Sequence, residues 1–488
     1  MEAWEERSIT RKITTEAKKT ADWKVAYIIG LSGTILVTGV AGPMVGAIGT
    51  WGWILMVITV IVGAIYCFFL AELATMFPEK VGGLPTYAVE GFRDKPWCDL
   101  LGGLNNWAYW MGWSPVITVN TSIMAVYAAV LGGYYDQFYA GVLPKWPIGY
   151  LYLLGFTVLV TAFLYAINYF GLTLGYRSAL GFAVLSIVPL FFLGIAPIVT
   201  GAVNWSNISP ANTGQVTVPF GTFAWFLAVW PWFFITTWNA LAMEATAGFL
   251  GEVKKPVSDA PRAMTAAALT GLVIYTIVPF ALLGVLGATS VAADPWGGFI
   301  KVAEAYAGPY SVYFVGIMLF AALLLSTTNA LIGCSRSLYQ SAIEGQTIRW
   351  FGKLNKHGSP ARAMLWGAIF NCALVLVVAG LPTLVYVVSN CGYLFSFIPT
   401  GLAYYRLKKG YKGMPERLRP FSLPKIMGPI ALFLVSFFIA VFIIGGPLSA
   451  YSVYAIAGLP IEPIFFFVLG IVILLMGIPM YVAAKKGS

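Results

Sequence analysis

A single carboxylate lies within a long apolar stretch of the chain. Residues 219–250 are mostly apolar and aromatic, and their last part reads WNALAMEATAGFL, with Glu244 inside it. An ionisable side chain in the hydrocarbon core of a membrane is costly, so it faces the protein interior and marks an ion pathway, a proton relay or an ion pair. The other interpretation is a protonated carboxyl that braces a helix break. We therefore expect Glu244 to exchange a proton or a cation, or to hold the backbone.

Trp238 provides an aromatic face six residues before Glu244. Its ring could stack on a bound molecule and would attract a cationic one, and ordinary aromatic packing is the alternative. The residues that follow the tryptophan would line the same site: Asn239, Ala240, Leu241 and Ala242. Because most of these are apolar, the sequence favours a neutral or broadly accepted ligand.

The composition predicts the elements that must position these residues. The chain has 488 residues, of which 59% are hydrophobic and 10% are charged, whereas soluble proteins have about 25% charged residues. A helix of about 20 apolar residues crosses a bilayer core of about 30 Å. Twelve segments meet that description: 25–48, 51–76, 104–132, 149–168, 178–201, 219–250, 263–288, 311–341, 363–381, 384–405, 426–446 and 460–483. The expected fold class is an all-α polytopic membrane protein.

The distribution of charge predicts the orientation in the membrane. With the N-terminus in the cytoplasm, the outer loops contain only Lys145 and Lys301 of the 29 Lys and Arg residues. Cytoplasmic loops are enriched in Lys and Arg, so both termini are expected in the cytoplasm of a cell membrane. This asymmetry explains the net charge of +10 without nucleic acid, and it suits anionic lipid headgroups. The polar first residues lack the apolar core of a secretory signal.

Two segments carry helix-weakening residues at corresponding places. The first reads VAYIIGLSGTILVTGVAGPMVGAIG, and Gly30, Ser32, Gly33 and Thr34 lie in it. Small residues also allow close helix packing, which is the alternative interpretation. The other irregular segment is the sixth, five segments later, and a repeat of five spans must insert in the inverted orientation. Interrupted helices at matching places of inverted halves indicate the central site of a secondary transporter.

Several chemistries are not supported by the sequence. The spans contain no cluster of His, Cys or paired carboxylates with ligand or acid–base spacing, so we expect neither a metal site nor a catalytic residue. No phosphate-binding loop with its lysine is present, so the sequence does not support ATP-driven transport. Glu72 and Arg336 lie near the inner ends of the second and eighth segments. They could form an ion pair beside an inner gate, or each could extend separately to the membrane interface.

Four stretches on the predicted inner side resemble the amino acid–polyamine–organocation (APC) superfamily of secondary transporters. They are AELATMFPEKVGGLPTYAVEGF at 71–92, GEVKKPVSDAPRAM at 251–264, SRSLYQSAIEGQTIRWFGKLNKHGSPARA at 335–363 and RLKKGYKGMPERLRPFSLPK at 406–425. The resemblance covers essentially the whole chain. It implies twelve helices, a five-plus-five inverted repeat with helices one and six broken, and two further helices. The implied parts are a tail at 1–24, repeats at 25–201 and 219–405, a basic loop at 406–425 and a final part at 426–488.

The resemblance also suggests roles for single residues. WNALAME is similar to the helix-six motif of arginine/agmatine antiporters, in which the tryptophan closes over the substrate and the acidic residue couples transport. Ser32 and Gly33 match the last two positions of the family's G-S-G break, which engages the substrate carboxylate, while Leu31 replaces the first glycine. Ser186 falls near the position where some proton-driven relatives carry Lys. Ser326, Thr327 and Thr328 fall where sodium-driven relatives place hydroxyls, although helix-backbone bonding is their simpler role.

The expected function is secondary active transport of amino acids by alternating access, with no cofactor other than a coupling ion. Proton coupling, sodium coupling and exchange without a net ion remain open. A neutral or broad-range amino acid is favoured, and an amine, polyamine or cationic amino acid is the alternative substrate. A membrane nutrient sensor on the same fold is the alternative of another class. The sequence gives no indication of the oligomeric state.

Overall fold

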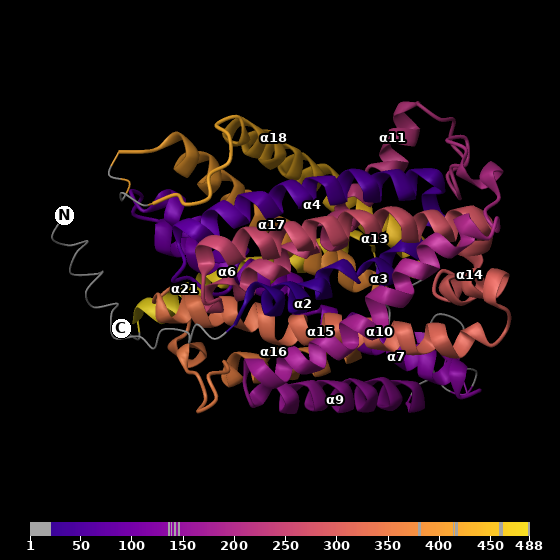
Figure 1. Cartoon of the computed structure of the whole chain (residues 1–488), viewed down its shortest axis with the longest axis horizontal. Helices are drawn as coiled ribbons and strands as arrows, with labels where there is room; N and C mark the ends of the chain where they lie inside the picture. Colours follow the sequence, from indigo (N-terminus) through magenta and orange to yellow (C-terminus); the bar gives the residue numbers. More distant parts are fainter. Residues whose placement is uncertain are drawn as a thin grey trace.

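The chain folds into a bundle of long helices that run side by side along one axis (Figure 1). The computed structural model describes residues 21–486, apart from 379–381, 458–461 and parts of 135–146 and 413–417. Ten helical segments in the described part are long and apolar enough to cross a membrane, and α16 is a shorter apolar helix. The only strands described are β1 (Tyr139–Ala140) and β2 (Leu143–Pro144), which pair antiparallel. The predicted all-α membrane fold is confirmed.

The first half of the chain contains two interrupted spans. Its elements are α2 (Trp23–Thr34), α3 (Val37–Ile48), α4 (Thr50–Met76), α5 (Leu84–Tyr87), η2 (Ala88–Phe92), α6 (Cys98–Trp113), α7 (Val116–Leu131), α9 (Ile148–Tyr169), α10 (Leu172–Val199) and η3 (Trp205–Ile208). The apolar segment predicted at 104–132 is helical but not continuous. The structure divides it into α6 and α7 at Ser114 and Pro115, because proline has no backbone N–H to continue the helical hydrogen bonds.

The second half repeats this mixture of continuous and interrupted helices. Its elements are α11 (Phe223–Val229), α12 (Pro231–Ala240), η4 (Ala242–Glu252), α13 (Pro256–Ala293), α14 (Gly298–Ala307), α15 (Ser311–Ile343), η5 (Arg349–Gly352), α16 (Ala361–Val377), α17 (Pro382–Lys409), α18 (Met427–Ala440), η6 (Val441–Gly445), α19 (Gly446–Ala457), α20 (Ile464–Leu475) and α21 (Gly477–Lys486). The division into two inverted repeats stays a prediction.

Local sequence signals explain where the central helices begin. The Asp22 side chain accepts hydrogen bonds from the backbone N–H groups of Lys24 and Val25 and so caps α2. Pro231 and Pro256 stand at the first positions of α12 and α13, where the missing N–H has no helical partner to lose. These starts fix the positions of the helices that hold the candidate site.

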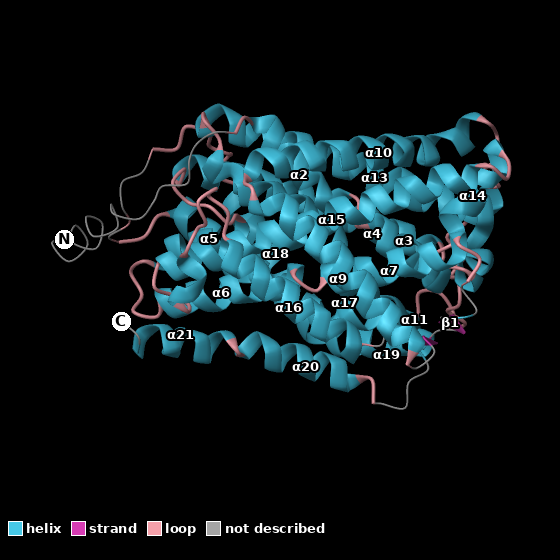
Figure 2. Ribbon diagram, turned by 90° about the horizontal axis from the view of Figure 1, so that it is seen from below, coloured by secondary structure: helices cyan, strands magenta, loops and turns pink. Residues whose placement is uncertain are grey.

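The broken helices lie in the middle of the bundle. The segment α2 packs against η4, α13, α15 and α10, while α3 packs against α13 and α4. On another side, α17 packs against α6 and α18. Figure 2 shows α20 and α21 along one edge of the bundle, away from α2. The segments on both sides of the two breaks, α2 and α3 in the first span and α12 and η4 in the sixth, are largely buried among other helices.

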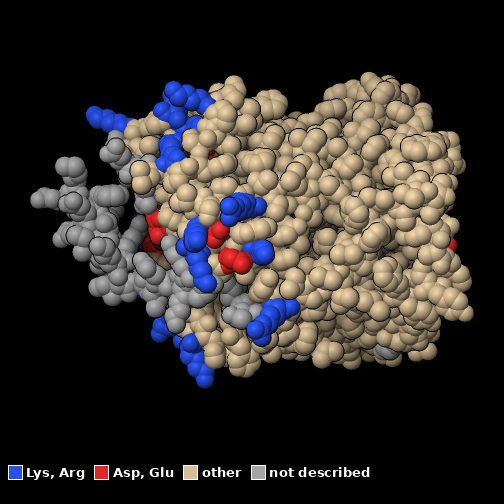
Figure 3. Space-filling view, in the orientation of Figure 1, with Lys and Arg blue, Asp and Glu red and all other residues tan. Residues whose placement is uncertain are grey.

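Charged side chains gather at one end of the molecule. On the face drawn in Figure 3, Lys and Arg lie at the end where α21 ends, while the opposite end shows almost none. Ion pairs link several of the residues that define this basic end: Lys80, Arg93, Arg336, Arg406 and Lys408. This separation agrees with the predicted charge asymmetry. Lys145 and residues 1–20 of the predicted tail lie outside the described residues.

Candidate functional site

The first span is broken between α2 and α3. The N–H of Ile35 bonds to the Leu31 carbonyl at 3.2 Å, and the N–H of Leu36 bonds to the Gly33 carbonyl at 3.3 Å. Both residues keep right-handed backbone angles, so the chain makes one tight turn and then continues. The break therefore lies after Thr34, later than the Leu31–Gly33 triplet that the sequence indicated. Leu31 itself stays within α2.

The sixth span changes its winding at Leu241. The α-helix α12 ends at Ala240, and η4 continues to Glu252 as eleven residues of 3-10 helix. Runs of 3-10 helix longer than about four residues are uncommon, and within a longer helix they often mark a hinge. The irregularity predicted at 236–248 is therefore present. Glu244 lies in the first turn of the rewound segment.

The two breaks touch each other through small residues. A Cβ atom placed on Gly33 would lie 1.8 Å from the Ala242 carbonyl oxygen, and one placed on Gly30 would lie 1.9 Å from the Thr246 hydroxyl. Both glycines are therefore needed for close approach of α2 and η4. Close packing was the alternative interpretation of these residues, and it operates here together with the break.

A tyrosine from a third helix connects both breaks. The hydroxyl of Tyr275 on α13 lies 2.7 Å from the Asn239 carbonyl oxygen and 3.2 Å from the Gly33 carbonyl oxygen. The Gly33 carbonyl also accepts from the Leu36 N–H and the Asn239 carbonyl from the Leu241 N–H, so the phenol adds a donor that the two breaks share. The sequence analysis did not identify Tyr275, although a tyrosine within an apolar span is a signal that could have drawn attention to it.

Glu244 is fully buried and surrounded by neutral donors. The carboxylate accepts hydrogen bonds from the Tyr393 hydroxyl at 2.9 Å, the Trp113 indole N–H at 3.0 Å and the Tyr109 hydroxyl at 3.2 Å. No basic residue in the described part of the chain forms an ion pair with Glu244. The carboxyl is therefore placed to hold a proton or a charge between η4, α6 and α17. None of these three partners was predicted from the sequence.

Trp238 lies between the sixth span and its neighbours. Its ring centroid is 4.8 Å from that of Tyr386 on α17, and its indole N–H donates to the Gly112 carbonyl at 3.2 Å. The Tyr386 hydroxyl donates to the Gly39 carbonyl on α3 at 2.6 Å. The aromatic pair thus connects both broken spans to the helices around them.

Several buried polar atoms near the breaks have no hydrogen-bond partner among the described residues. They are Ser32 Oγ, Thr34 Oγ1, Asn239 Oδ1 and Nδ2, and Thr246 Oγ1. A buried polar group without a partner costs about 1–3 kcal/mol. Their shared position on α2, α12 and η4 gives the breaks a set of donors and acceptors that a small polar ligand could satisfy. Ala240, Leu241 and Ala242 beside them are fully buried.

The hydroxyls suggested for cation binding are used within the protein. Thr327 and Thr328 donate to the carbonyls of Leu323 and Leu324 in their own helix, and Ser186 donates to the Phe182 carbonyl at 2.7 Å. Ser326 accepts from the Asn120 amide at 2.8 Å. In the described residues, no group of three or more His, Cys, Asp or Glu could hold a metal ion. A coupling role for Ser186, Ser326, Thr327 and Thr328 stays a prediction.

The suggested pair between Glu72 and Arg336 is not formed, and this expectation is corrected. Glu72 on α4 pairs with Lys408 of α17 at 2.7 Å, because α4 presents this side chain toward the end of α17. Arg336 on α15 pairs instead with Glu252 at 2.5 Å, and its guanidinium lies 4.8 Å from the Phe249 ring centroid. Arg336 therefore holds the far end of η4 at the basic end.

The polar ends of the helices at this end are connected in a second network. Lys80 pairs with Glu90 at 2.9 Å and with Glu344 at 2.7 Å, and Arg93 pairs with Glu90 at 2.6 Å. Burial raises the pKa of Glu90, but the charges and hydrogen bonds of Lys80 and Arg93 outweigh it and lower that pKa to about 2. The loop between α4 and α6 is therefore fastened to α15 by charge.

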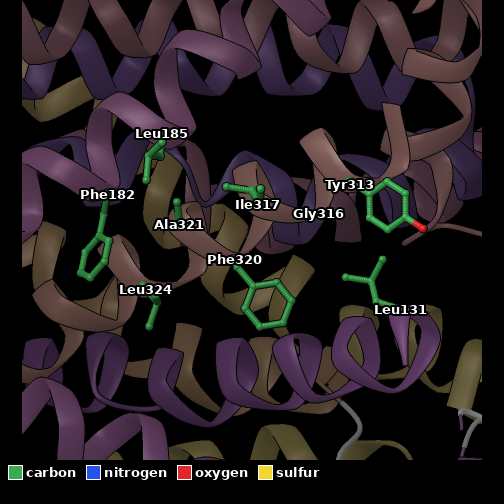
Figure 4. A pocket seen from close by; sticks show the side chains of 9 residues that line it. All are labelled: Leu131, Phe182, Leu185, Tyr313, Gly316, Ile317, Phe320, Ala321 and Leu324. Atoms are coloured by element: carbon green, nitrogen blue, oxygen red, sulfur yellow. The ribbon is translucent and has the colours of Figure 1, made fainter. Parts of the chain in front are cut away.

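A separate apolar pocket of about 370 Å³ lies away from the breaks. Its walls come from α7, α10 and α15, and Figure 4 shows their side chains: Leu131, Phe182, Leu185, Tyr313, Gly316, Ile317, Phe320, Ala321 and Leu324. Several of these, including Tyr313 and Ile317, are exposed on the outside of the bundle. Because the wall is almost entirely apolar, it offers no group that would recognise a zwitterion.

A bundle of membrane helices with two touching breaks around a buried carboxyl is the architecture of membrane transport proteins. A sequence profile described as "Amino acid permease" matches residues 22–478. The chain therefore belongs to the amino acid permease family, which confirms the resemblance to the APC superfamily. Members of this family are transporters and not enzymes, as expected.

Characterised relatives are distant in sequence. The γ-aminobutyric acid permease of Bacillus subtilis is 24% identical over 72% of this chain and 71% of its own length. The polyamine transporter PUT1 of Oryza sativa is 24% identical over 79% of this chain and 65% of its own length. The D-serine/D-alanine/glycine transporter of Escherichia coli is 22% identical over 58% of this chain and 55% of its own length. These names support amino acid transport as the general function.

Proposed function

We propose that the protein is a secondary active transporter that moves amino acids across the membrane by alternating access. The observation that carries this proposal is the contact between the two breaks, where polar atoms of Ser32, Thr34 and Asn239 are buried without hydrogen-bond partners in the described part of the chain. A zwitterionic ligand would provide partners of both kinds, because its ammonium donates and its carboxylate accepts. Movement of η4 against α2 would then open the site to one side at a time.

The proposed substrate is a neutral or broadly accepted amino acid. The unpartnered side chains at the breaks are hydroxyls and one amide, which carry no charge. Both oxygens of Glu244 already accept hydrogen bonds from neutral side chains, so they are not offered to a cationic substrate. The names of the γ-aminobutyric acid and D-serine/D-alanine/glycine relatives agree with this choice. Other relatives are named as a polyamine transporter and an arginine/ornithine antiporter, so an amine or a cationic amino acid is the alternative substrate.

Proton coupling through Glu244 is the favoured mode of energy coupling. The carboxyl is buried within the bundle, and in the described part of the chain its partners are Tyr109, Trp113 and Tyr393, none of which carries a compensating positive charge. A site of that kind can accept and release a proton during each cycle. Sodium coupling through Ser326 and its neighbours is the alternative. The basic end would face the cytoplasm of a cell membrane, following the positive-inside asymmetry.

Uptake into proteoliposomes tests the assignment of the site. The purified protein is reconstituted, and labelled amino acids are supplied under an imposed pH gradient, a sodium gradient or neither. We expect saturable uptake driven by the pH gradient, which Glu244→Gln abolishes and Trp238→Ala reduces at least about tenfold, equivalent to 1.4 kcal/mol. The control is Glu304→Gln, since Glu304 is an exposed residue on α14.

Three other results would change the proposal. Unchanged uptake in both site variants would remove the site from the breaks. Uptake that follows only the sodium gradient would select the alternative coupling ion. Ligand-dependent stabilisation without any flux would identify a sensor, because a ligand that binds the folded state raises its stability whether or not it is moved.

A further inference from the structure

A second pocket opens at the basic end, between the end of α17 and the side of α18. Its volume is about 420 Å³, and it is lined by Phe92, Leu402, Tyr405, Arg406, Lys409, Gly410, Tyr411 and Leu432. The residues come from η2, α17, the following loop and α18. None of them takes part in the helix breaks, so the pocket is separate from the proposed transport site.

One side of this pocket is cationic. Arg406 is held by Asp94 at 2.9 Å, and its guanidinium lies 4.9 Å from the ring centroids of both Phe92 and Tyr411. Lys409 lies 5.9 Å above the Tyr405 ring, and no carboxylate of the described residues is within ion-pair distance of its ammonium. Among the described residues, Asp94 is thus the acidic side chain paired with Arg406, and no acidic side chain pairs with Lys409.

The other side of the pocket is apolar and faces outward. Leu402 lies about two turns before Lys409 on α17, and Leu432 on α18 is 40% exposed. The apolar surface continues from there along α18, where Phe433 is 71% exposed. Exposed apolar side chains of this kind on a membrane helix face hydrocarbon.

The depth of the pocket matches the boundary between water and hydrocarbon. The apolar span of α17 ends at Lys409, and the next span begins at Met427. Aromatic rings and basic side chains are enriched at that boundary, and Tyr405, Tyr411 and Phe92 are present here. Figure 3 shows basic side chains gathered at this end of the molecule. The pocket therefore places basic side chains where a lipid headgroup would lie and an apolar wall where an acyl chain of the same lipid would lie.

We propose that this pocket binds an anionic glycerophospholipid, with its phosphate at Lys409 and Arg406 and one acyl chain along Leu402 and Leu432. The unneutralised charge of Lys409 selects an anionic lipid over a zwitterionic one, because basic pockets between membrane helices bind acidic headgroups. The apolar wall selects a lipid over a free phosphate ion. This site is independent of the proposed transport function.

Thermal unfolding of the delipidated full-length protein in detergent tests this proposal. Dioleoyl phosphatidylglycerol, dioleoyl phosphatidylcholine and sn-glycerol 3-phosphate are added separately. We expect phosphatidylglycerol to raise Tm by several degrees, phosphatidylcholine to raise it less, and glycerol phosphate to leave it unchanged. Native mass spectrometry of the same samples counts the bound phosphatidylglycerol molecules.

Two pairs of matched variants localise the effect. Lys409→Gln should reduce the phosphatidylglycerol shift at least about twofold, while Lys356→Gln, which removes the same charge from another exposed loop, keeps it. Leu432→Ser should also reduce the shift, while Leu376→Ser, at an equally exposed leucine (40% and 41%), keeps it.

Each opposite result would overturn the proposal. Equal Tm shifts with phosphatidylcholine and phosphatidylglycerol would show that the pocket does not distinguish lipids by headgroup charge. An equal shift with glycerol phosphate would show a site for a free anion. If Lys409→Gln retains both the full shift and the full number of bound lipids, the anionic lipid binds elsewhere.

Discussion

The hydroxyl of Tyr275 lies 2.7 Å from the carbonyl oxygen of Asn239, at the point where the sixth span changes its winding. The same hydroxyl lies 3.2 Å from the Gly33 carbonyl beside the break of the first span. A phenol has one hydrogen to donate, so the two carbonyls share it. The two breaks are therefore connected through a single side chain of α13.

Replacement Tyr275→Phe should weaken this connection and impair transport. Both carbonyls keep a backbone donor, from Leu36 and Leu241, but lose the bond from the phenol. We therefore expect the free energy of unfolding to fall by about 0.5–1.5 kcal/mol and uptake to decrease. Thermal unfolding and proteoliposome uptake measure the two effects. The control is Tyr66→Phe, whose hydroxyl donates to the Phe397 carbonyl at 3.3 Å. If both variants reduce uptake equally, the hydroxyl of Tyr275 has no special relation to the breaks.

Replacement Gly33→Ala should separate the broken helices. The added Cβ would lie 1.8 Å from a backbone atom, the Ala242 carbonyl oxygen, which cannot rotate away. Overpacking of this kind costs about 1–3 kcal/mol or more, and we expect uptake to be lost. Gly39→Ala in the same span is the matched control, because its Cβ would meet nothing closer than the Tyr386 hydroxyl at 3.7 Å. Normal uptake by Gly33→Ala would contradict the observed contact.

The ion pair between Arg336 and Glu252 should show strong coupling in a double-mutant cycle. Both side chains are largely buried, with 8% and 13% exposure, and removal of one partner leaves a buried charge at a cost of about 3–5 kcal/mol. We therefore expect Arg336→Met and Glu252→Gln to lower Tm more as single variants than in combination. Lys301→Met, which breaks the exposed pair with Asp294, should change the unfolding free energy by at most about 1 kcal/mol. Additive single effects would show that the pair is not formed.

The stability of the protein should depend on Glu90 in acid. Because its pKa is lowered from 4.5 to about 2 in the folded state, the folded protein favours the ionised carboxylate. Its contribution is complete above about pH 4.5 and is lost as the pH falls toward 2. Tm of the wild type should therefore exceed that of Glu90→Gln at pH 7, and the difference should shrink between pH 4.5 and pH 3. A difference that stays constant over this range would contradict the ion pairs of Glu90.

The sequence predicted the spans and the two irregular helices well, because apolar length and helix-weakening residues are local signals. It also identified Glu244 as a buried carboxyl, because a charge in an apolar span is rare. The division of the third span at Pro115 was not predicted, because a proline within a span can either end a helix or only kink it. Its actual effect depends on how α6 and α7 pack.

The partners of the site residues could not be predicted from the sequence. A pair between Glu72 and Arg336 was one of two possibilities, whereas their actual partners, Lys408 and Glu252, come from segments distant in sequence. Tyr275 and Tyr393 were missed for a related reason. A tyrosine in an apolar span has the same appearance in sequence whether it faces lipid or donates to a buried oxygen, and only the packing of the helices distinguishes the two.

The winding of η4 also determines its length. A 3-10 helix rises about 2.0 Å per residue and an α-helix about 1.5 Å, so the eleven residues from Ala242 to Glu252 span about 5 Å more than they would in an α-helix. Glu252, the last residue of η4, reaches Arg336 because the segment is extended in this way. Rewinding the segment as an α-helix would shorten it and would withdraw Glu252 from Arg336 toward the centre of the bundle.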